Sequence, residues 1–282
     1  MKQCNIGGQA VIEGVMMRSP KKTAIAVRKP DNSIFIYKEP TRSLSERFKF
    51  LKLPVLRGML ALIESLVVGI RALSFSAQQA GEEGEELTTK DVIIAVVSAV
   101  VFGVGIFMIL PTIVAKFIHG VLSNTVLLNL IEGVVRLSIF LLYVVMISRM
   151  KDIQRVFQYH GAEHKSIHCL EAEEELKVEN VRKYSTLHPR CGTSFLLIVM
   201  LVSIMVFSFL GWPNLLLRIV SRLLLFPLVA GVSYEIIKYA GRSNSPFIKT
   251  INAPGLWLQK LTTREPDDSQ IEVAIEALKE VR

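Results

Sequence analysis

Two long stretches of this sequence contain no charged residue, and they narrow the choice of folds more than any other feature. One runs from Val92 to Ala115 and the other from Cys191 to Leu217. Each exceeds the roughly 20 apolar residues that an α-helix needs to cross the hydrocarbon core of a bilayer. The stretches therefore predict an α-helical integral membrane protein.

A second apolar stretch follows each of these after a short connection. Residues 125–148 contain two charged residues, and residues 219–239 contain three. Buried helices of a soluble domain are the alternative interpretation. The position of residues 125–148 and 219–239 directly after the charge-free stretches favours two membrane hairpins, which gives about four transmembrane helices in all.

A further apolar segment, residues 53–80, differs from these four because its charges are regularly spaced. Arg57, Glu64 and Arg71 recur at intervals of seven residues and form one polar stripe on a helix. This pattern is typical of an amphipathic helix that lies on the membrane surface. A segment that enters the membrane is the alternative.

The distribution of basic residues predicts the orientation in the membrane. Lys and Arg lie mainly before the first hairpin, between the hairpins and after the second, whereas the hairpin turns carry little more than Lys116 and Arg218. By the positive-inside rule, both termini and the central segment are cytoplasmic in a multi-pass protein of the cell membrane. The net charge of +8 then reflects this topology and an affinity for membrane lipids. The sequence lacks the basic, aromatic-rich patch of a nucleic-acid-binding protein, so no nucleic acid is expected as a partner.

The second helix of each hairpin carries an arginine in a similar setting. Arg136-Leu-Ser-Ile-Phe140 and Arg222-Leu-Leu-Leu-Phe226 both occur early in these helices, which hints at an internal repeat. Arg136 also follows Glu132 at the i, i+4 spacing of a helical ion pair. We interpret this pair as structural, with a functional intramembrane charge as the alternative.

The remaining segments are expected on the cytoplasmic side. Thr23–Arg28 and Ser33–Lys38 have the composition of two strands, and Pro30-Asp31-Asn32 between them is typical of a turn. Near the C-terminus, Ser269-x-x-Glu272 predicts a capping box that opens a final helix to about Val281. The predicted organisation is a cytoplasmic β-hairpin region (1–52), an interfacial helix (53–80), the first hairpin (91–148), a cytoplasmic His-rich segment (149–192), the second hairpin (193–240) and a cytoplasmic C-terminal segment (241–282).

Chemistry concentrates in the His-rich segment. His160, His164 and His168 are spaced i, i+4 and i+8, so a helix places them on nearly one face, with Glu163 beside them. His160-x-x-Glu163-His164 also matches the H-x-x-E-H arrangement of inverted zinc proteases, in which two histidines hold the metal and the glutamate acts on water. The alternative is a solvated helix whose polar groups make ordinary hydrogen bonds.

A third ligand for such a metal would come from elsewhere on the cytoplasmic face. His188 and Cys191 directly precede the third span, and Glu235 lies near the cytoplasmic end of the fourth. His168 is a further candidate. The predicted cofactor is therefore a divalent metal, with zinc the leading candidate, and Glu163 is the candidate general base.

Five separate blocks of the sequence resemble the YqhQ-like family of bacterial membrane proteins, and the resemblance covers nearly the whole chain. The blocks are Gly7-Gly-Gln-Ala-Val-Ile-Glu-Gly-Val-Met-Met-Arg-Ser-Pro20, Tyr159-His-Gly-Ala-Glu-His-Lys165, His188-Pro-Arg-Cys-Gly-Thr-Ser194, Ser233-Tyr-Glu235 and Ala253-Pro-Gly-Leu-Trp-Leu-Gln259. The family has no known function and is described as containing predicted metal-dependent enzymes. The resemblance thus implies a metal but no particular reaction.

Two functions fit these patterns. The first is a metal-dependent hydrolase with its site at the cytoplasmic membrane face, acting on a membrane protein or a lipid. The second is a non-enzymatic membrane assembly or scaffold protein, in which the same residues form a structural metal site or a polar cluster. Three protein ligands with an open position would favour catalysis, and a closed four-ligand site would favour structure.

Overall fold

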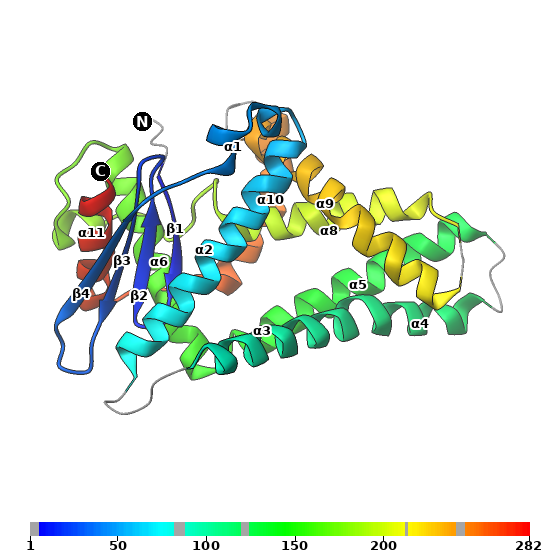
Figure 1. Cartoon of the computed structure of the whole chain (residues 1–282), viewed down its shortest axis with the longest axis horizontal. Helices are drawn as coiled ribbons and strands as arrows, with labels where there is room; N and C mark the ends of the chain where they lie inside the picture. The colour runs from blue at the N-terminus through cyan, green and yellow to red at the C-terminus, as the bar shows by residue number, and fades with distance from the viewer. Residues whose placement is uncertain (1–5, 82–87, 120–123, 212–213, 241–245) are drawn as a thin grey trace.

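The structure, a computed structural model, describes residues 6–81, 88–119, 124–211, 214–240 and 246–282. A small antiparallel sheet with its covering helices forms one end, and a group of long apolar helices extends away from it (Figure 1). The mostly helical architecture and the small N-terminal sheet agree with the predicted fold class.

The N-terminal sheet has four strands in the order β1-β2-β3-β4, each antiparallel to its neighbour. The two predicted strands are present as β3 and β4, but the glycine-rich segment before them also forms a hairpin. Val11 pairs with Gly14 across a two-residue turn in which Glu13 adopts a φ of 50°. The prediction of a single β-hairpin was therefore too small. The strands span Gly7–Val11 (β1), Gly14–Arg18 (β2), Lys22–Arg28 (β3) and Ile34–Pro40 (β4).

Helices cover both faces of this sheet. Helices α6 (Lys151–Glu171) and α11 (Asp268–Val281) pack on one face, where Val15 and Ala26 are buried. Helix α2 (Leu56–Ala80) packs on the other face against Met16 and Ile25. The central strands are therefore apolar on both sides, which hides the two-residue alternation that reveals half-exposed strands.

The final helix has the predicted apolar face and a different cap. Ile271, Ala274 and Leu278 are fully buried against the sheet. The capping box is formed by Asp267 and Gln270, so the helix begins two residues before the predicted Ser269 cap. The prediction of a box at Ser269 was wrong because Asp267, itself a strong N-cap residue, takes that role.

The first hairpin consists of a long interrupted helix and its return. Helix α3 (Thr89–Val104) continues through a π-helical turn, η2 (Gly105–Ile109), into α4 (Leu110–His119). Helix α5 (Thr125–Ile147) runs back beside it. Pro111 follows the π-helical turn, in keeping with the irregularity expected at a proline that lacks an N–H.

The second hairpin consists of α8 (Gly192–Ser208) and α9 (Leu215–Ala240). The Asn129 side-chain amide donates a hydrogen bond of 2.7 Å to the Leu210 carbonyl, which joins the start of α5 to the end of α8. The end of α4, the start of α5, the end of α8 and the start of α9 thus lie at the same end of the molecule, far from the sheet (Figure 1). Residues 120–123 and 212–213, which connect these helices, lie outside the described residues.

Among the residues that the structure describes, four helices are long and apolar enough to cross a membrane, but they are not the predicted four. They span Leu56–Ala80, Thr89–Ile118, Thr125–Ile147 and Leu215–Tyr239. Helix α8, the expected third span, has only 17 residues. The expected interfacial segment, now α2, meets the length and composition of a span, although its C-terminal half packs on the sheet.

Shorter elements join these parts. Helix α10 (Pro246–Thr262) lies along α8, and Leu258 is buried against Phe140 of α5. An ion pair between Glu13 and Arg155 connects the sheet to α6, and one between Arg18 and Glu64 connects it to α2. Glu13 and Arg18 of the N-terminal segment thus both have structural partners. The remaining elements are α1 (Leu44–Arg47), η1 (Lys49–Lys52) and α7 (Val178–Val181).

Candidate metal centre

Two histidines of α6 and one cysteine from the start of α8 meet where the sheet domain joins the helical bundle. One potential ligand atom from each of His160, His164 and Cys191 lies within 4.8 Å of the others. His160 Nε2 is 3.2 Å from Cys191 Sγ. Two imidazoles and a thiol are donors that zinc prefers, and this set leaves one tetrahedral position open.

Backbone carbonyls determine how the two imidazoles are oriented. His160 Nδ1 lies 2.8 Å from the Thr262 carbonyl, and His164 Nδ1 bonds to the Thr186 carbonyl. Because a carbonyl only accepts, each Nδ1 carries a hydrogen, and each neutral ring keeps a free lone pair on Nε2. Metal-binding histidines are commonly held in this way, so the orientation fits a divalent cation.

A helix N-terminus holds the cysteine. Cys191 is the N-cap of α8, and the backbone N–H of Thr193 donates to its Sγ at 3.4 Å. The positive end of the helix dipole points at this sulfur. A negatively charged ligand is stabilised at such a position.

Glycine permits α6 to approach its neighbours closely at this site. A Cβ on Gly161 would lie 2.1 Å from the Arg264 carbonyl oxygen, so only glycine allows α6 to pack against the segment that orients His160. A Cβ on Gly8 would lie 2.7 Å from Cγ of Glu163. The close contacts that require these two glycines are made between segments distant in the sequence.

Glu163 lies beside the three potential ligands and is almost fully buried. Its Oε2 is 3.9 Å from His160 Nε2, and the Gly8 backbone N–H donates to its carboxylate. Burial raises the pKa of Glu163, while the nearby His160 and His188 rings oppose the increase. A carboxylate with a raised pKa is better suited to accept a proton than one fully exposed to water.

Burial also lowers the pKa of His164 below the ordinary value, although its contact with Cys191 opposes this. The shift favours the neutral ring at neutral pH. Only the neutral imidazole can offer a lone pair to a metal.

A second group of potential ligands lies next to the first. His168, Glu171 and His188 offer atoms within 4.8 Å of one another, and the His164 and His188 ring centroids are 5.7 Å apart. The Arg190 guanidinium forms an ion pair with Glu171. His188 Nδ1 accepts the Arg190 backbone N–H, so the neutral ring carries its hydrogen on Nε2, 3.5 Å from the Glu171 carboxylate. This group resembles a hydrogen-bonded ion cluster more than a ligand set.

Glu235, the remaining predicted ligand, lies outside both groups. Its carboxylate pairs with the Arg57 guanidinium and accepts the Val55 backbone N–H. Glu235 lies near the C-terminal end of α9. Helix α2 packs along α9 there and supplies an arginine as the partner of this carboxylate in place of a histidine. Arg57, one of the regularly spaced charges of the predicted interfacial helix, is that partner.

The candidate site opens into a cavity of about 760 Å³. Its walls come from β1, α2, α6 and the start of α8, and they include Leu62, Leu66 and Leu196 on the side of the bundle. His160, Glu163 and Cys191 all line it. The cavity is large enough for a small molecule or for part of a larger substrate.

Three contributors to the site were missed by reasoning from the sequence: one side chain and two backbone carbonyls. Glu171 was not among the predicted site residues, but it is buried beside His188. A signal was available, because His168-x-x-Glu171 repeats the spacing of His160-x-x-Glu163. The carbonyls of Thr186 and Thr262 could not have been found, because nothing in the sequence marks a backbone oxygen as a partner of a distant ring.

Comparisons with known proteins identify the family. Residues 53–282 match the model of a family described as protein of unknown function, DUF1385. The chain is 37% identical over 291 residues to the uncharacterized protein YqhQ of Bacillus subtilis (strain 168), covering 98% of this chain and 91% of YqhQ. No solved structure matches the chain. The resemblance read from the five sequence blocks is thereby confirmed at the level of the family, and the chain belongs to the DUF1385 proteins of unknown function.

Proposed function

We propose that this protein is a multi-pass protein of the cell membrane and a metal-dependent hydrolase with its site at the cytoplasmic membrane face. One observation carries the proposal: His160, His164 and Cys191 converge beside a buried carboxylate, and all of them face one cavity. The arrangement joins a potential ligand set, a candidate base and space for a substrate.

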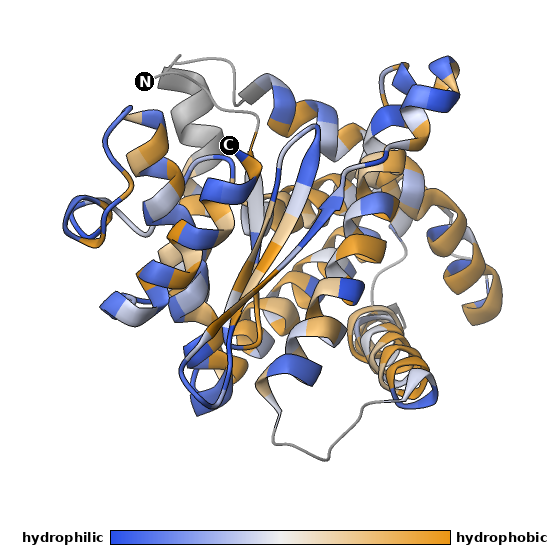
Figure 2. Ribbon diagram, turned by 60° about the vertical axis from the view of Figure 1, so that its left-hand side comes forward, coloured by the Kyte–Doolittle hydropathy of each residue, from blue (hydrophilic) through white to orange (hydrophobic). Residues whose placement is uncertain are grey.

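The surface of the helices supports a membrane location. Val101 is 66% exposed, Leu216 is 70% exposed and Leu224 is 74% exposed, and many other large apolar side chains of the bundle are also exposed. Figure 2 shows hydrophobic colouring over most of the bundle helices. An apolar surface of this extent is unfavourable in water and suits the hydrocarbon core of a bilayer.

Cys191 is the best candidate for the third ligand. It shares one group with His160 and His164, whereas His168 and His188 belong to the neighbouring group with Glu171. Three protein ligands are typical of catalytic zinc sites, which keep a position for water. A divalent metal held there would act as a Lewis acid and activate a water molecule for attack on an acyl or phosphoryl centre.

Glu163 is the candidate general base. Its carboxylate is held by the Gly8 N–H and lies within 4 Å of His160 Nε2 (3.9 Å), so it can accept a proton from water in the cavity and later return it to a leaving group. His160 and His164 would not compete for this role, because each donates its Nδ1–H to a carbonyl and would give its Nε2 lone pair to the metal.

The cavity walls suggest a substrate that is partly apolar. Leu62 and Leu66 of α2 and Leu196 of α8 line it, and both helices extend into the bundle. A membrane lipid or a membrane-protein segment could enter from the bundle side.

Metal analysis of the purified full-length protein tests the ligand set. We expect about one equivalent of divalent metal per chain, and loss of most of it in the His160→Ala, His164→Ala and Cys191→Ala variants. The His168→Ala variant is the matched control from the same helix and should keep its metal. Absence of metal after purification and after reconstitution with zinc would overturn the proposal.

A second variant separates the hydrolase from a scaffold. Glu163→Gln keeps the size of the side chain and removes the base. In a strain that depends on the protein, the variant should retain its metal and membrane insertion but lose biological function, since a general base typically contributes 10²–10⁴-fold in rate. Full function of Glu163→Gln with bound metal would favour the structural metal site of a scaffold protein.

A further inference from the structure

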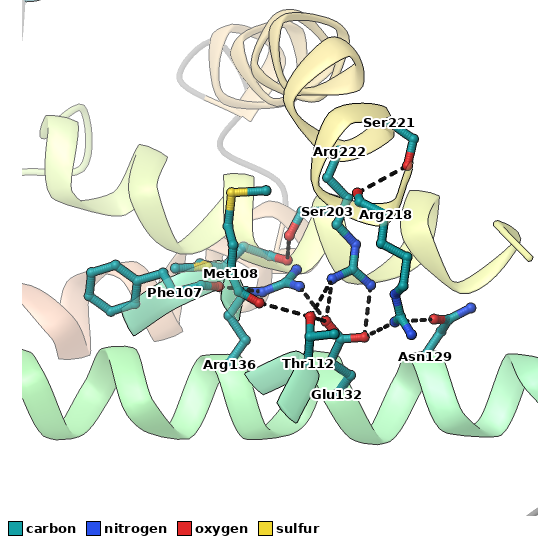
Figure 3. A network of polar contacts seen from close by, with 11 residues as sticks. Phe107, Met108, Thr112, Asn129, Glu132, Arg136, Ser203, Arg218, Ser221 and Arg222 are labelled. Atoms are coloured by element: carbon teal, nitrogen blue, oxygen red, sulfur yellow. Dashed lines mark hydrogen bonds and ion pairs between the residues drawn. The ribbon is translucent and has the colours of Figure 1, made fainter. Parts of the chain in front are cut away.

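A buried ionic network fixes α9 in the bundle. The Glu132 carboxylate of α5 is fully buried and forms ion pairs with Arg136 of the same helix and with Arg218 and Arg222 of α9 (Figure 3). The predicted i, i+4 pair is therefore part of a larger network, and both arginines of the suspected repeat meet in it. Because this network joins the two hairpins, the C-terminal end of α9 has a defined level in the bundle, against which other segments can be placed.

The segment that precedes α2 is held near this end of α9. The Val55 backbone N–H donates to the Glu235 carboxylate at 3.3 Å, and Arg57 Nε donates to the same carboxylate at 2.7 Å. Glu235 lies five residues before Ala240, the last residue of α9, which is about 7.5 Å along a helix. In a bilayer that α9 crosses, the residues just before Val55 therefore lie at one lipid surface.

Helices α1 and η1 form a short loop in this segment, the α1–η1 loop (residues 42–53), and both of its ends are held. At its start, Ser43 Oγ and the Leu44 backbone N–H each donate at 2.9 Å to the Glu64 carboxylate of α2. Its end leads into Val55, which is bound to α9. The loop thus has a defined position, yet no residue of α1 or η1 is buried.

The surface of the α1–η1 loop is both apolar and basic. Phe50 is 58% exposed, and three further apolar side chains are exposed as well: Leu44, Phe48 and Leu53. The ring centroids of Phe48 and Phe50 are 6.1 Å apart. The loop contains one acidic residue, Glu46, and four exposed basic residues: Arg42, Arg47, Lys49 and Lys52. Within the described residues, none of these four cations forms an ion pair.

We propose that the α1–η1 loop docks on the cytoplasmic lipid surface, with its apolar side chains among the headgroups and its basic residues against anionic phospholipids. Exposed phenylalanines beside unpaired cations are unfavourable in water and fit a surface where acyl chains meet negative charge. Tyr239 of α9, 70% exposed and about one turn beyond Glu235, places a further aromatic side chain near the same level, as is typical of the membrane interface.

The proposal rests on the membrane location in the proposed function and does not require hydrolase activity. It also accounts for α2, whose start is held beside the docked loop while its C-terminal half packs on the sheet. Helix α2 would then run along one side of the membrane instead of crossing it. The cavity wall that Leu62 and Leu66 of α2 form would lie close to the lipid surface.

Fluorescent labels on engineered cysteines test this placement in the full-length protein, reconstituted in vesicles of equimolar phosphatidylcholine and phosphatidylglycerol. Every chain carries Cys4→Ser, and Cys169 and Cys191 are buried. The quencher is a phospholipid with a nitroxide on its acyl chain near the headgroup.

Three positions are compared. Phe50→Cys places the label on the loop, and Tyr37→Cys, at an exposed aromatic residue of β4, is the matched control on the sheet. Leu224→Cys, at a residue of α9 that is 74% exposed, reports whether the bundle itself lies in the bilayer.

The label at Phe50→Cys should be quenched at least about twofold more than that at Tyr37→Cys, because the apolar face of an interfacial segment lies about 5–10 Å into the headgroup and acyl boundary. Omission of phosphatidylglycerol, or Arg47→Gln together with Lys49→Gln, should reduce this quenching at least about twofold, since each basic residue adds to the attraction to an anionic surface. Lys177→Gln together with Lys183→Gln, at exposed cations on either side of α7, is the charge control and should leave it unchanged.

Quenching at Leu224→Cys but not at Phe50→Cys would overturn the proposal and leave an acidic protein as the partner of the loop. Quenching at neither position would overturn the membrane location as well. Quenching at Phe50→Cys that is the same without phosphatidylglycerol or in the Arg47→Gln, Lys49→Gln chain would also overturn the proposal, because anionic lipid would then have no part in docking. Metal content measured on the same samples should equal that of the wild type, so the loop and the metal centre are tested separately.

Discussion

Replacement of Glu132 by glutamine should destabilise the protein far more than replacement of any one of its partners. The carboxylate is fully buried, and Arg136, Arg218 and Arg222 all pair with it. Glu132→Gln removes the negative charge that all three guanidinium groups share and leaves these groups in an apolar bundle. Removal of one partner from a buried ion pair typically costs about 3–5 kcal/mol, and we expect a loss at the upper end of that range.

The opposite change should cost much less. Arg136→Gln leaves Glu132 with two guanidinium partners and lowers the positive excess of the cluster. The remaining loss comes mainly from the hydrogen bond between Arg136 Nε and the Phe107 carbonyl, about 1–3 kcal/mol for a buried group left without its partner. The two substitutions should therefore lower the free energy of unfolding by different amounts, although both break the Glu132–Arg136 ion pair.

The assay is an SDS titration of the purified protein in mixed micelles, followed by far-ultraviolet circular dichroism. Glu280→Gln is the control for loss of a glutamate charge, because its ion pair with Lys38 is exposed and should contribute about 1 kcal/mol or less. If Glu132→Gln lost no more stability than Glu280→Gln, or less than Arg136→Gln, the reasoning from charge imbalance would be refuted.

Three further outcomes are expected. Gly161→Ala should lower both the unfolding midpoint and the metal content, because the new Cβ would lie 2.1 Å from the Arg264 carbonyl oxygen. The control Gly192→Ala, whose Cβ would have no atom within 4 Å, should change neither, and equal midpoints for the two variants would contradict the close approach of α6 to Arg264. Burial lowers the pKa of His164, His168 and His188 in the folded state, so below about pH 6.5 the unfolded chain binds more protons and the metal-free protein should lose stability. An unchanged thermal midpoint between about pH 7.5 and about pH 5.5 would contradict this. Lys279 is exposed, and the C-terminus is predicted to be cytoplasmic, so Lys279→Cys in a chain that also carries Cys4→Ser should react with a membrane-impermeant thiol reagent only in inverted vesicles. Labelling in intact cells would show that the predicted topology is inverted.

The helical elements could be predicted well because their signals are local. The apolar runs give α3–α4 and α5, and the histidine spacing gives α6, since a helix brings residues four apart onto one face whatever surrounds it. The apolar stripe of α11 was likewise correct. Prediction was less complete for the sheet: β3 was recognised as a strand and β2 was not, although α2 covers the same side of both strands.

The candidate site was predictable in part for the same reason. His160, Glu163 and His164 are fixed relative to one another by one helix, so their proximity follows from the sequence alone. Which residue joins them from elsewhere depends on packing. Cys191 and Glu235 were equal candidates in the sequence, but α8 begins beside α6 and brings the thiol to His160, while α2 lies along α9 and pairs Glu235 with Arg57.

The buried ionic cluster around Glu132 shows most clearly which features the sequence determines and which depend on tertiary packing. The sequence determined that Glu132 and Arg136 lie on one face of a helix and that a similar arginine occurs in the second hairpin. Only the tertiary structure brought Arg222 and Arg218 to the same carboxylate, across about 90 residues of chain (86 and 90 residues apart). Covalent geometry fixes what happens within one or two helical turns, whereas contacts between distant segments depend on how whole helices pack, and no local pattern of residues encodes that arrangement.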